Sequence, residues 1–335
     1  LEFYQKAAAL GDASAFIPLG SRLLNGDQAI RNEKEGREWL AKAIEKEQWA
    51  AYLALGDFEE NVKKDDKAAL ANYQKGAEKE QGDCMLRVAA FHLEGKGGLE
   101  KSEEKGKEWL VKAAEAGNAL AALEMASRLS NAEKPDLLGA YKYLLSAANT
   151  GLPAAQNEIG LLYVSGKMGL SDPTAGVAWF TAAAKAGFAA AQNNLGTLYE
   201  RGMGVPVDYN NAGQLYSLAA NQGHAAATTG LARLHAAGHG TDQNLAKAWA
   251  LASLAIERGD DKEAKTLLGD LTSKMSEAQI SEGKKELDTL RKPAEPKPAG
   301  EKPAPVKPVV PAPKKTEAVT PAIEIPATET PKEDK

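Results

Sequence analysis

Apolar residues recur along most of this chain at the three- and four-residue spacing of amphipathic helices. In one clear stretch, Ala191, Leu195, Leu198 and Tyr199 fall within a single arc when residues are placed about 100° apart. No run of alternating β-branched residues competes with this pattern. The sequence therefore predicts that residues 3–291 are almost wholly helical and contain no sheet.

A nine-residue pattern returns along the chain at intervals of 33 to 37 residues. Its clearest copies are WFTAAAKAG from Trp179, YLLSAANTG from Tyr143 and LYSLAANQG from Leu215. The remaining copies begin at Phe3, Trp39, Asn72, Trp109 and Leu251. A second amphipathic helix lies between successive copies, so each repeat is a helix, a turn, a helix and a loop. One such pair cannot bury its apolar face alone, which predicts that the pairs stack into a continuous array.

Residues with special backbone preferences mark the ends of these helices. Eight positions after the first residue of each copy stands a glycine in six repeats, namely Gly11, Gly117, Gly151, Gly187, Gly223 and Gly259. Glycine there predicts a helix end in the left-handed conformation. Glu47 and Glu80 take this place in the other two repeats, which predicts distortion of those helix ends. Asp172 and Pro173 predict an N-cap followed by proline at the first helical position.

The chain resembles the Sel-one-like repeat (SLR) family, a relative of the tetratricopeptide (TPR) repeats. The residues that fit the first helix and loop of that family's repeat are Ala191, Leu195, Gly196, Leu198, Tyr199, Gly202, Gly204 and Val205. Those that fit its second helix are Trp179, Ala183, Ala184 and Gly187. The resemblance covers about residues 3–291. It implies an all-α, right-handed α-solenoid of about seven antiparallel helix pairs that binds a protein or peptide in its concave groove.

The two ends of the predicted solenoid differ in character. Ser276 and Gln279 have the spacing of a capping box, which predicts a polar helix over about 276–291 that closes the array within a domain spanning residues 1–291. Residues 292–335 hold most of the prolines, with many lysines and no aromatic residue, and predict a disordered, partly polyproline-II tail. Its PxxP spacings, at Pro305–Pro308 and Pro308–Pro311, suit an SH3-like domain but also arise by chance in so dense a tract.

Composition narrows the class of partner and the location. A net charge of -5 gives no reason to expect nucleic acid, and no stretch is apolar for long enough to span a membrane. The single cysteine, Cys84, excludes an internal disulfide framework and is interpreted as a small core residue. The chain opens at Leu1 inside a helical pattern, so we expect a trimmed N-terminus. The Lys-Pro-Ala tail resembles spacers of bacterial cell-envelope proteins and favours a periplasmic or secreted location over a cytoplasmic one.

Several histidines and glycines could carry chemistry, but each also has a structural interpretation. His235 and His239 are four residues apart, but no glutamate follows His235 and no third metal ligand is evident beyond Asp242. The Gly-x-Gly runs at 95–97, 202–204 and 238–240 follow no predicted strand and are interpreted as turns between helices. His92 stands where other repeats carry tyrosine, and His224 in a turn. We therefore predict no enzyme, no cofactor and no metal; the alternative is a repeat-based cell-envelope enzyme or small-molecule binder.

The resemblance places the binding groove on the first helix of each repeat, at positions that point away from Leu195. The candidate partner-binding residues are Ile17, Leu53, Leu86, Leu93, Leu123, Asn157, Asn193, Asn194, Thr197, Arg201, Thr229 and Arg233. The series is apolar in the N-terminal repeats and polar in the C-terminal ones. Two interpretations remain open: the leucines pack between neighbouring helices, or they form an apolar groove for a hydrophobic anchor of the partner.

Overall fold

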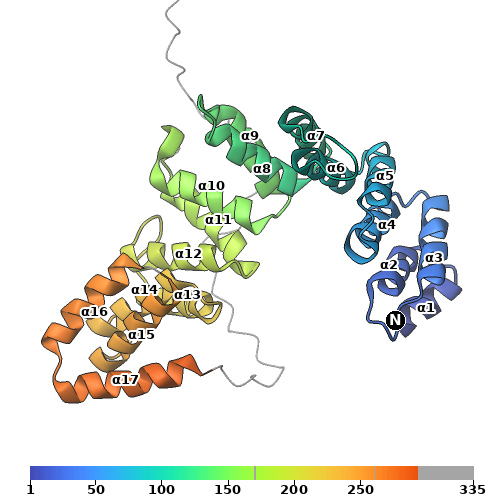
Figure 1. Ribbon diagram of the computed structural model, residues 1–335. Coiled ribbons are helices and arrows are strands. Elements are labelled where there is room, and N and C mark those ends of the chain that lie inside the picture. The colour runs from blue at the N-terminus through green and yellow to red at the C-terminus, as the bar shows by residue number, and fades with distance from the viewer. Residues whose placement is uncertain (170, 260, 293–335) are drawn as a thin grey trace, which may run out of the picture. The chain divides into compact units, whose positions relative to one another are not determined.

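A computed structural model describes residues 1–169, 171–259 and 261–292 of the chain. These residues form 17 α-helices and no strand, which confirms the all-α solenoid fold (Figure 1). The predicted C-terminal tail lies outside the described residues, apart from Lys292. The chain divides into two compact units, one ending at Thr150 and one beginning at Gly151. Each unit is described by itself below.

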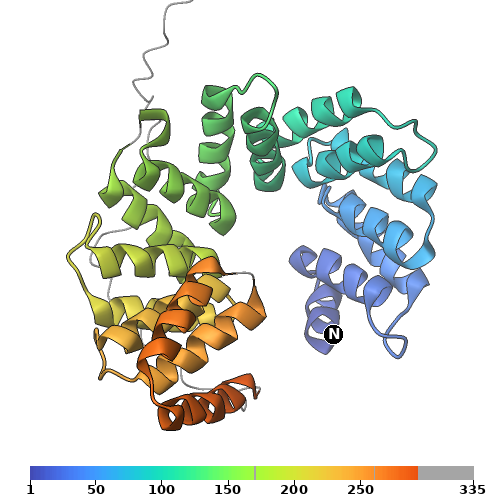
Figure 2. The same cartoon turned by 60° about the vertical axis from the view of Figure 1, so that its left-hand side comes forward.

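Unit 1 contains one single helix followed by four helix pairs (Figure 2). Its helices are α1 (Glu2–Ala9), α2 (Phe16–Asn25), α3 (Glu33–Glu45), α4 (Ala51–Phe58), α5 (Asp66–Ala77), α6 (Gly82–Glu94), α7 (Glu103–Glu115), α8 (Ala119–Ser130) and α9 (Leu137–Asn149). A short 3-10 turn (Ala13–Ala15) precedes α2, and one π-helical turn (Glu59–Lys63) extends α4. We call the first helix of each pair the A helix and the second the B helix; α1 is a B helix.

Unit 2 contains three helix pairs and two closing helices. Its helices are α10 (Pro153–Ser165), α11 (Pro173–Lys185), α12 (Ala189–Arg201), α13 (Tyr209–Asn221), α14 (Ala225–Ala237), α15 (Leu245–Arg258), α16 (Lys262–Lys274) and α17 (Glu277–Arg291). A 3-10 turn (Lys167–Gly169) follows α10. The capping box at Ser276 and Gln279 is present and opens α17, which packs on α15. The sequence therefore placed the terminal helix correctly.

Each B helix from α3 to α15 packs against the A helix of its own pair, and several successive A helices also contact each other directly. Such contacts join α2 to α4 and α4 to α6 in unit 1, and α10 to α12 and α12 to α14 in unit 2, where α14 also contacts the closing helix α16. The buried interior of unit 2 combines alanines with a few large side chains, among them Phe180, Leu195 and Tyr216. Small residues allow this close approach because the helix axes can come nearer to one another. These contacts place the A helices side by side from α2 to α6 in unit 1 and from α10 to α14 in unit 2.

Left-handed residues end most of the B helices, as the sequence predicted. Gly187 has φ 86° and Gly223 has φ 87°. Glu47 and Glu80 adopt the same conformation, with φ 59° and 57°, so the predicted distortion of those helix ends is wrong. The repeat geometry is kept there despite the missing glycine, and both glutamates are exposed. The exception is Gly259, which is extended with φ -175°; the left-handed prediction fails at this end of the array.

Most single-residue predictions about capping and burial are confirmed. Asp172 accepts hydrogen bonds from the backbone of the first turn of α11, with Pro173 at its start. Cys84 and His92 are both buried in α6. His224 does more than occupy a turn: it is the N-cap of α14, and its Nδ1 accepts a hydrogen bond from the backbone of Ala227 at 3.3 Å.

Candidate protein-binding surface

The apolar candidates of unit 1 occupy the row of A helices but are neither open to solvent nor fully buried. Ile17, Leu53, Leu86, Leu93 and Leu123 lie on α2, α4, α6 and α8, and each is half-buried. Ile17 packs against the core cluster that contains the N-terminal helices. The side chains therefore combine the two interpretations left open by the sequence: part of each packs between helices, and part remains accessible.

A polar cluster lies at the C-terminal end of α4 in unit 1. The hydroxyl of Tyr73, on α5, lies 2.8 Å from Asp57 Oδ1 and 2.8 Å from Glu60 Oε2, both on the preceding A helix and its π-helical turn. One phenol proton can be donated to only one of these carboxylates at a time. Arg87 of the next A helix lies 3.2 Å from Asp57 and supplies positive charge. The hydrogen bonds of Tyr73 thus join the two helices of one pair, and the ion pair between Arg87 and Asp57 links that pair to the next A helix.

The π-helical turn after α4 positions two of these acids. It directs Glu60 toward Tyr73 and leaves Glu59 only 8% exposed. Glu59 accepts a hydrogen bond from the Arg37 guanidinium at 2.7 Å. Arg37 also pairs with Glu33, one turn earlier on α3. An isolated buried carboxylate would be costly, and the guanidinium offsets that cost.

In unit 2 the polar candidates form hydrogen bonds from one A helix to the next. Asn194 on α12 donates its amide to Asn157 Oδ1 on α10 at 2.9 Å. Thr197 lies 3.1 Å from the hydroxyl of Tyr216, and Asn193 and Asn194 are half-buried beside it. Asn157 is only 4% exposed, so its predicted outward orientation is wrong. Its side chain accepts the hydrogen bond that joins α10 to α12.

The strongest group of contacts in unit 2 is centred on Arg233 of α14. Its guanidinium donates to both carboxylate oxygens of Glu200, at 3.1 and 2.6 Å, and to Glu263 at 2.5 Å. The hydroxyl of Tyr216 donates to Glu200 at 2.6 Å. These bonds tie α12, α13, α14 and α16 together. A bidentate arginine–carboxylate pair of this kind has a fixed geometry as well as charge complementarity.

Thr229, the last polar candidate of the series, is fully buried. Its hydroxyl lies 2.6 Å from Asp261, the N-cap of α16, and 3.3 Å from the carbonyl of Ala225. The prediction that Thr229 faces outward is wrong, because α16 covers this part of α14 and the hydroxyl caps the junction. Arg201, by contrast, is exposed at the end of α12.

Burial and pairing shift several pKa values in this surface. Burial alone would raise the pKa of Glu200, but hydrogen bonds from Arg233 and Tyr216 hold it below the ordinary value. Burial and the neighbouring carboxylates raise the pKa of Tyr73, and burial and Glu200 raise that of Tyr216. Glu200 is therefore ionised and both phenols are neutral near pH 7. The surface presents fixed charges.

Sequence reasoning missed the tyrosines that organise both clusters. Tyr73 and Tyr216 occupy the same place in their repeats, directly after the first residue of the nine-residue copy, and both are fully buried. A glycine of an A helix faces each ring: a Cβ at Gly56 would lie 2.3 Å from Tyr73, and one at Gly196 would lie 2.9 Å from Tyr216. The available signal was tyrosine at this place with glutamate at the matching A-helix positions, Glu60 and Glu200.

Other candidate sites offer little chemistry. His239 stacks on Tyr209 at 4.2 Å between ring centroids, whereas His235 lies in α14. Burial raises the pKa of the Cys84 thiol to about 12, which leaves it unreactive. Within residues 1–169, 171–259 and 261–292, no three potential metal ligands come together. In the same part of the chain, no helix is long and apolar enough to cross a membrane.

Comparison with known proteins identifies the repeats. The family model described as Sel1 repeat matches residues 1–12, 19–47, 49–80, 82–118, 153–188, 189–224 and 225–260. The segment between 118 and 153, which contains α8 and α9, is not matched. A Sel1 repeat protein from Oxalobacter formigenes is similar in structure, with a TM-score of 0.54 and 25% identity over 70% of this chain and 98% of its own.

Two further relatives extend the comparison. A protective antigen of uropathogenic Escherichia coli with an SLR fold has a TM-score of 0.50 and 22% identity, covering 86% of this chain and 70% of its own, which supports the fold alone. Chitin synthase regulatory factor 3 of Schizosaccharomyces pombe is 28% identical over 128 residues. That match covers 36% of this chain but only 14% of the yeast protein.

Proposed function

The chain belongs to the Sel1 repeat family, and from this premise we propose that it is a non-catalytic scaffold or adaptor that holds a partner protein or peptide on its A helices. Sel1 repeats generally mediate protein–protein interaction. The single observation that carries the proposal is the row of A helices, where apolar and charged side chains are partly accessible yet fixed in place. Its two units present different surfaces.

The A helices of unit 1 offer partly accessible leucines beside charged side chains. Leu53, Leu86 and Leu123 occupy the same position in three successive repeats, so their accessible parts recur from one helix to the next. Half-buried leucines of this kind contribute to a partner interface because their remaining apolar area is removed from water on binding. The partner that suits unit 1 is a protein segment with apolar anchor residues.

The A helices of unit 2 offer a rigid polar surface. Asn193, Thr197 and Arg233 are half-buried, and hydrogen bonds within the array already fix the last two. Because those side chains are ordered before binding, a partner loses little additional side-chain entropy when it contacts them. Exposed Arg201 and Leu161, which is 39% exposed on α10, add one charged and one apolar contact. This surface suits a segment that offers hydrogen-bonding groups.

Paired leucine substitutions test the proposal. Leu53→Ser with Leu86→Ser removes the accessible apolar row of unit 1, and quantitative mass spectrometry compares the proteins captured by immobilised variant and unmodified chains. Ile44→Ser is the matched control, because Ile44 is also half-buried but lies on the B helix α3. The proposal expects proteins that both the unmodified chain and the control capture and the double variant loses.

The half-buried state of these leucines sets the expected cost of the changes. A half-buried leucine loses part of its packing on truncation, so each substitution should lower the free energy of unfolding by about 1–2 kcal/mol, below the range for fully buried leucines. Urea unfolding of all three chains measures this directly. If the double variant and the Ile44→Ser control capture the same proteins to the same extent, the A helices of unit 1 do not hold the partner.

A further inference from the structure

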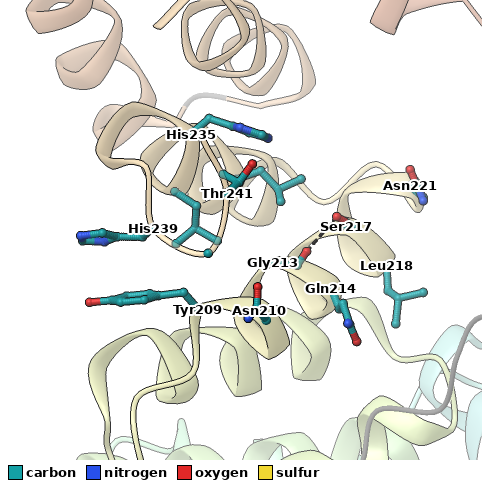
Figure 3. A pocket seen from close by; sticks show the side chains of 13 residues that line it. Tyr209, Asn210, Gly213, Gln214, Ser217, Leu218, Asn221, His235, His239 and Thr241 are labelled. Atoms are coloured by element: carbon teal, nitrogen blue, oxygen red, sulfur yellow. Dashed lines mark hydrogen bonds between the residues drawn. The ribbon is translucent and has the colours of Figure 1, made fainter. Parts of the chain in front are cut away.

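Unit 2 contains a groove away from the A-helix contacts described above. It has a cavity volume of 590 Å³ and lies between α13, the C-terminal half of α14 and the loop at Gly240 and Thr241. In Figure 3 the stacked rings of Tyr209 and His239 lie at one end, and Gly213 and Ser217 lie between that pair and Asn221. Leu231 and Leu234 of α14 supply apolar lining.

The groove exists because one side chain is missing from the repeat pattern. Gly213 stands two residues before the start of its nine-residue copy, where the other repeats in the array carry a larger side chain. Three of these equivalents, Leu70, Tyr141 and Val177, are buried. At Gly213, an added Cβ would meet only Leu234, at 3.5 Å. A position that other repeats use for packing is therefore open.

The lining of the groove is uncharged but rich in hydrogen-bonding groups. Asn210, Gln214, Ser217 and Asn221 follow one face of α13 at spacings of three and four residues. The side-chain amides of Asn210, Gln214 and Asn221 have no hydrogen-bond partner in the described part of the chain, so they can donate to a ligand. The imidazole of His235 is neutral, because burial and nearby Lys247 lower its pKa. A charged ligand would find no counter-ion in this groove.

These features fit a proline-rich segment in the polyproline-II conformation. Such a segment is uncharged along its proline stretches and presents mainly carbonyl acceptors, because proline lacks an N–H. Amide donors and an aromatic pair are the groups that recognise it. The row from Asn210 to Asn221 is about 16 Å long, which matches about five polyproline-II residues at about 3.1 Å each.

The chain itself carries a segment with this chemistry. Residues 308–313 read PVVPAP, contain no charge, and include Pro308 and Pro311 of the PxxP spacings. They follow α17, which belongs to unit 2, after a linker that spans up to about 50 Å when extended. A tether of this kind gives an effective concentration in the millimolar range, so even a weak site is occupied.

We propose that the groove over Gly213 binds the uncharged proline-rich segment of the chain's own C-terminal tail, residues 308–313. The valines enter the space left by Gly213 and contact the leucines of α14, while the amides of α13 donate to the carbonyls of the segment. Because no Asp, Glu, Lys or Arg lines the groove, the interaction should depend only weakly on salt concentration.

Photo-crosslinking of the full chain tests this contact. A benzophenone amino acid replaces Gln214, and the matched control places it at Glu108, the exposed equivalent position on α7. After irradiation, mass spectrometry of proteolytic peptides should find crosslinks to residues 308–313 at a yield roughly fivefold or more above that of the control, in low and high salt alike. A mixture of isotopically light and heavy chains identifies crosslinks between molecules.

Two further substitutions separate a specific contact from random proximity of the tail. Gly213→Leu fills the groove, and Val309→Asp with Val310→Asp places charge in the segment without touching any helix. Each should reduce the crosslink yield to that of the Glu108 control. The proposal is overturned by equal yields at 214 and 108, by crosslinks that survive both changes, or by crosslinks that join light to heavy chains.

Discussion

Exchanging glycine and glutamate at the left-handed helix ends tests how the repeat boundary is specified. Glu80 and Glu47 have φ of 57° and 59°, and Gly187 at the equivalent place has φ 86°. The left-handed conformation costs a residue with a side chain about 1–2 kcal/mol, because its Cβ is crowded by the backbone. Glycine at the same place costs about 0.5–1 kcal/mol in lost chain entropy. Glu80→Gly and Glu47→Gly should therefore each stabilise their repeats by about 0.5–1 kcal/mol.

The reverse substitution is sterically simple. A Cβ at Gly187 would meet nothing within 4 Å, so Gly187→Glu tests backbone conformation without a clash. It should destabilise its repeat by about 1 kcal/mol. Gly259→Ala is the matched control, because Gly259 has φ -175° and an added Cβ would only touch Ala225 at 3.4 Å. This change should be neutral or slightly stabilising.

Local stability is the appropriate measurement. A repeat array unfolds partly repeat by repeat, so one melting temperature can hide a change confined to one helix end. Native-state hydrogen exchange of amides in α5 for Glu80→Gly, and in α11 for Gly187→Glu, reports the affected helix directly. Glu80→Gly should raise the protection of its helix and Gly187→Glu should lower it, because glycine adopts the left-handed conformation at the lower cost. The reasoning is refuted if both substitutions shift protection in the same direction.

Three further outcomes follow from buried polar groups. His92→Tyr should stabilise unit 1 by about 1 kcal/mol in urea unfolding. Nδ1 of His92 lacks a hydrogen-bond partner beside a 390 Å³ cavity, and Tyr199 fills the equivalent place in its own repeat. A loss of stability would show that this cavity suits the imidazole better. Burial lowers the pKa of His92, His224 and His235 below 6.5, so the unfolded chain binds more protons than the folded one. The free energy of unfolding should therefore fall as the pH drops from 6.5 toward the lowered pKa values. Urea midpoints at pH 7.5 and pH 5 check this, and an unchanged or higher midpoint at pH 5 would contradict it. Tyr216→Phe removes a hydrogen bond to ionised Glu200 and should cost about 2 kcal/mol by the same assay; no change would mean that Arg233 alone satisfies the carboxylate.

The sequence by itself determined the repeat and its ends. The spacing of apolar positions specified helix pairs, and Asp172, Ser276 and Gln279 specified caps, because these features depend on residues within one or two helical turns. The buried places of Cys84 and His92 followed from the same periodicity. Such local chemistry can be read without knowing which helices later become neighbours.

Only the tertiary structure decided what the A-helix surface contains. Asn157 and Thr229 share the periodicity of exposed positions, yet they are buried because α12 and α16 bring hydrogen-bonding partners to them from 37 and 32 residues away, respectively. The left-handed glutamates show the same dependence, since stacking of the repeats imposes a backbone that their own preference opposes. That Gly213 faces a groove is likewise a tertiary feature, because Leu231 and Leu234 of α14 form the opposite lining. Periodicity gives the direction of a side chain, whereas its exposure and partners depend on the neighbouring repeat.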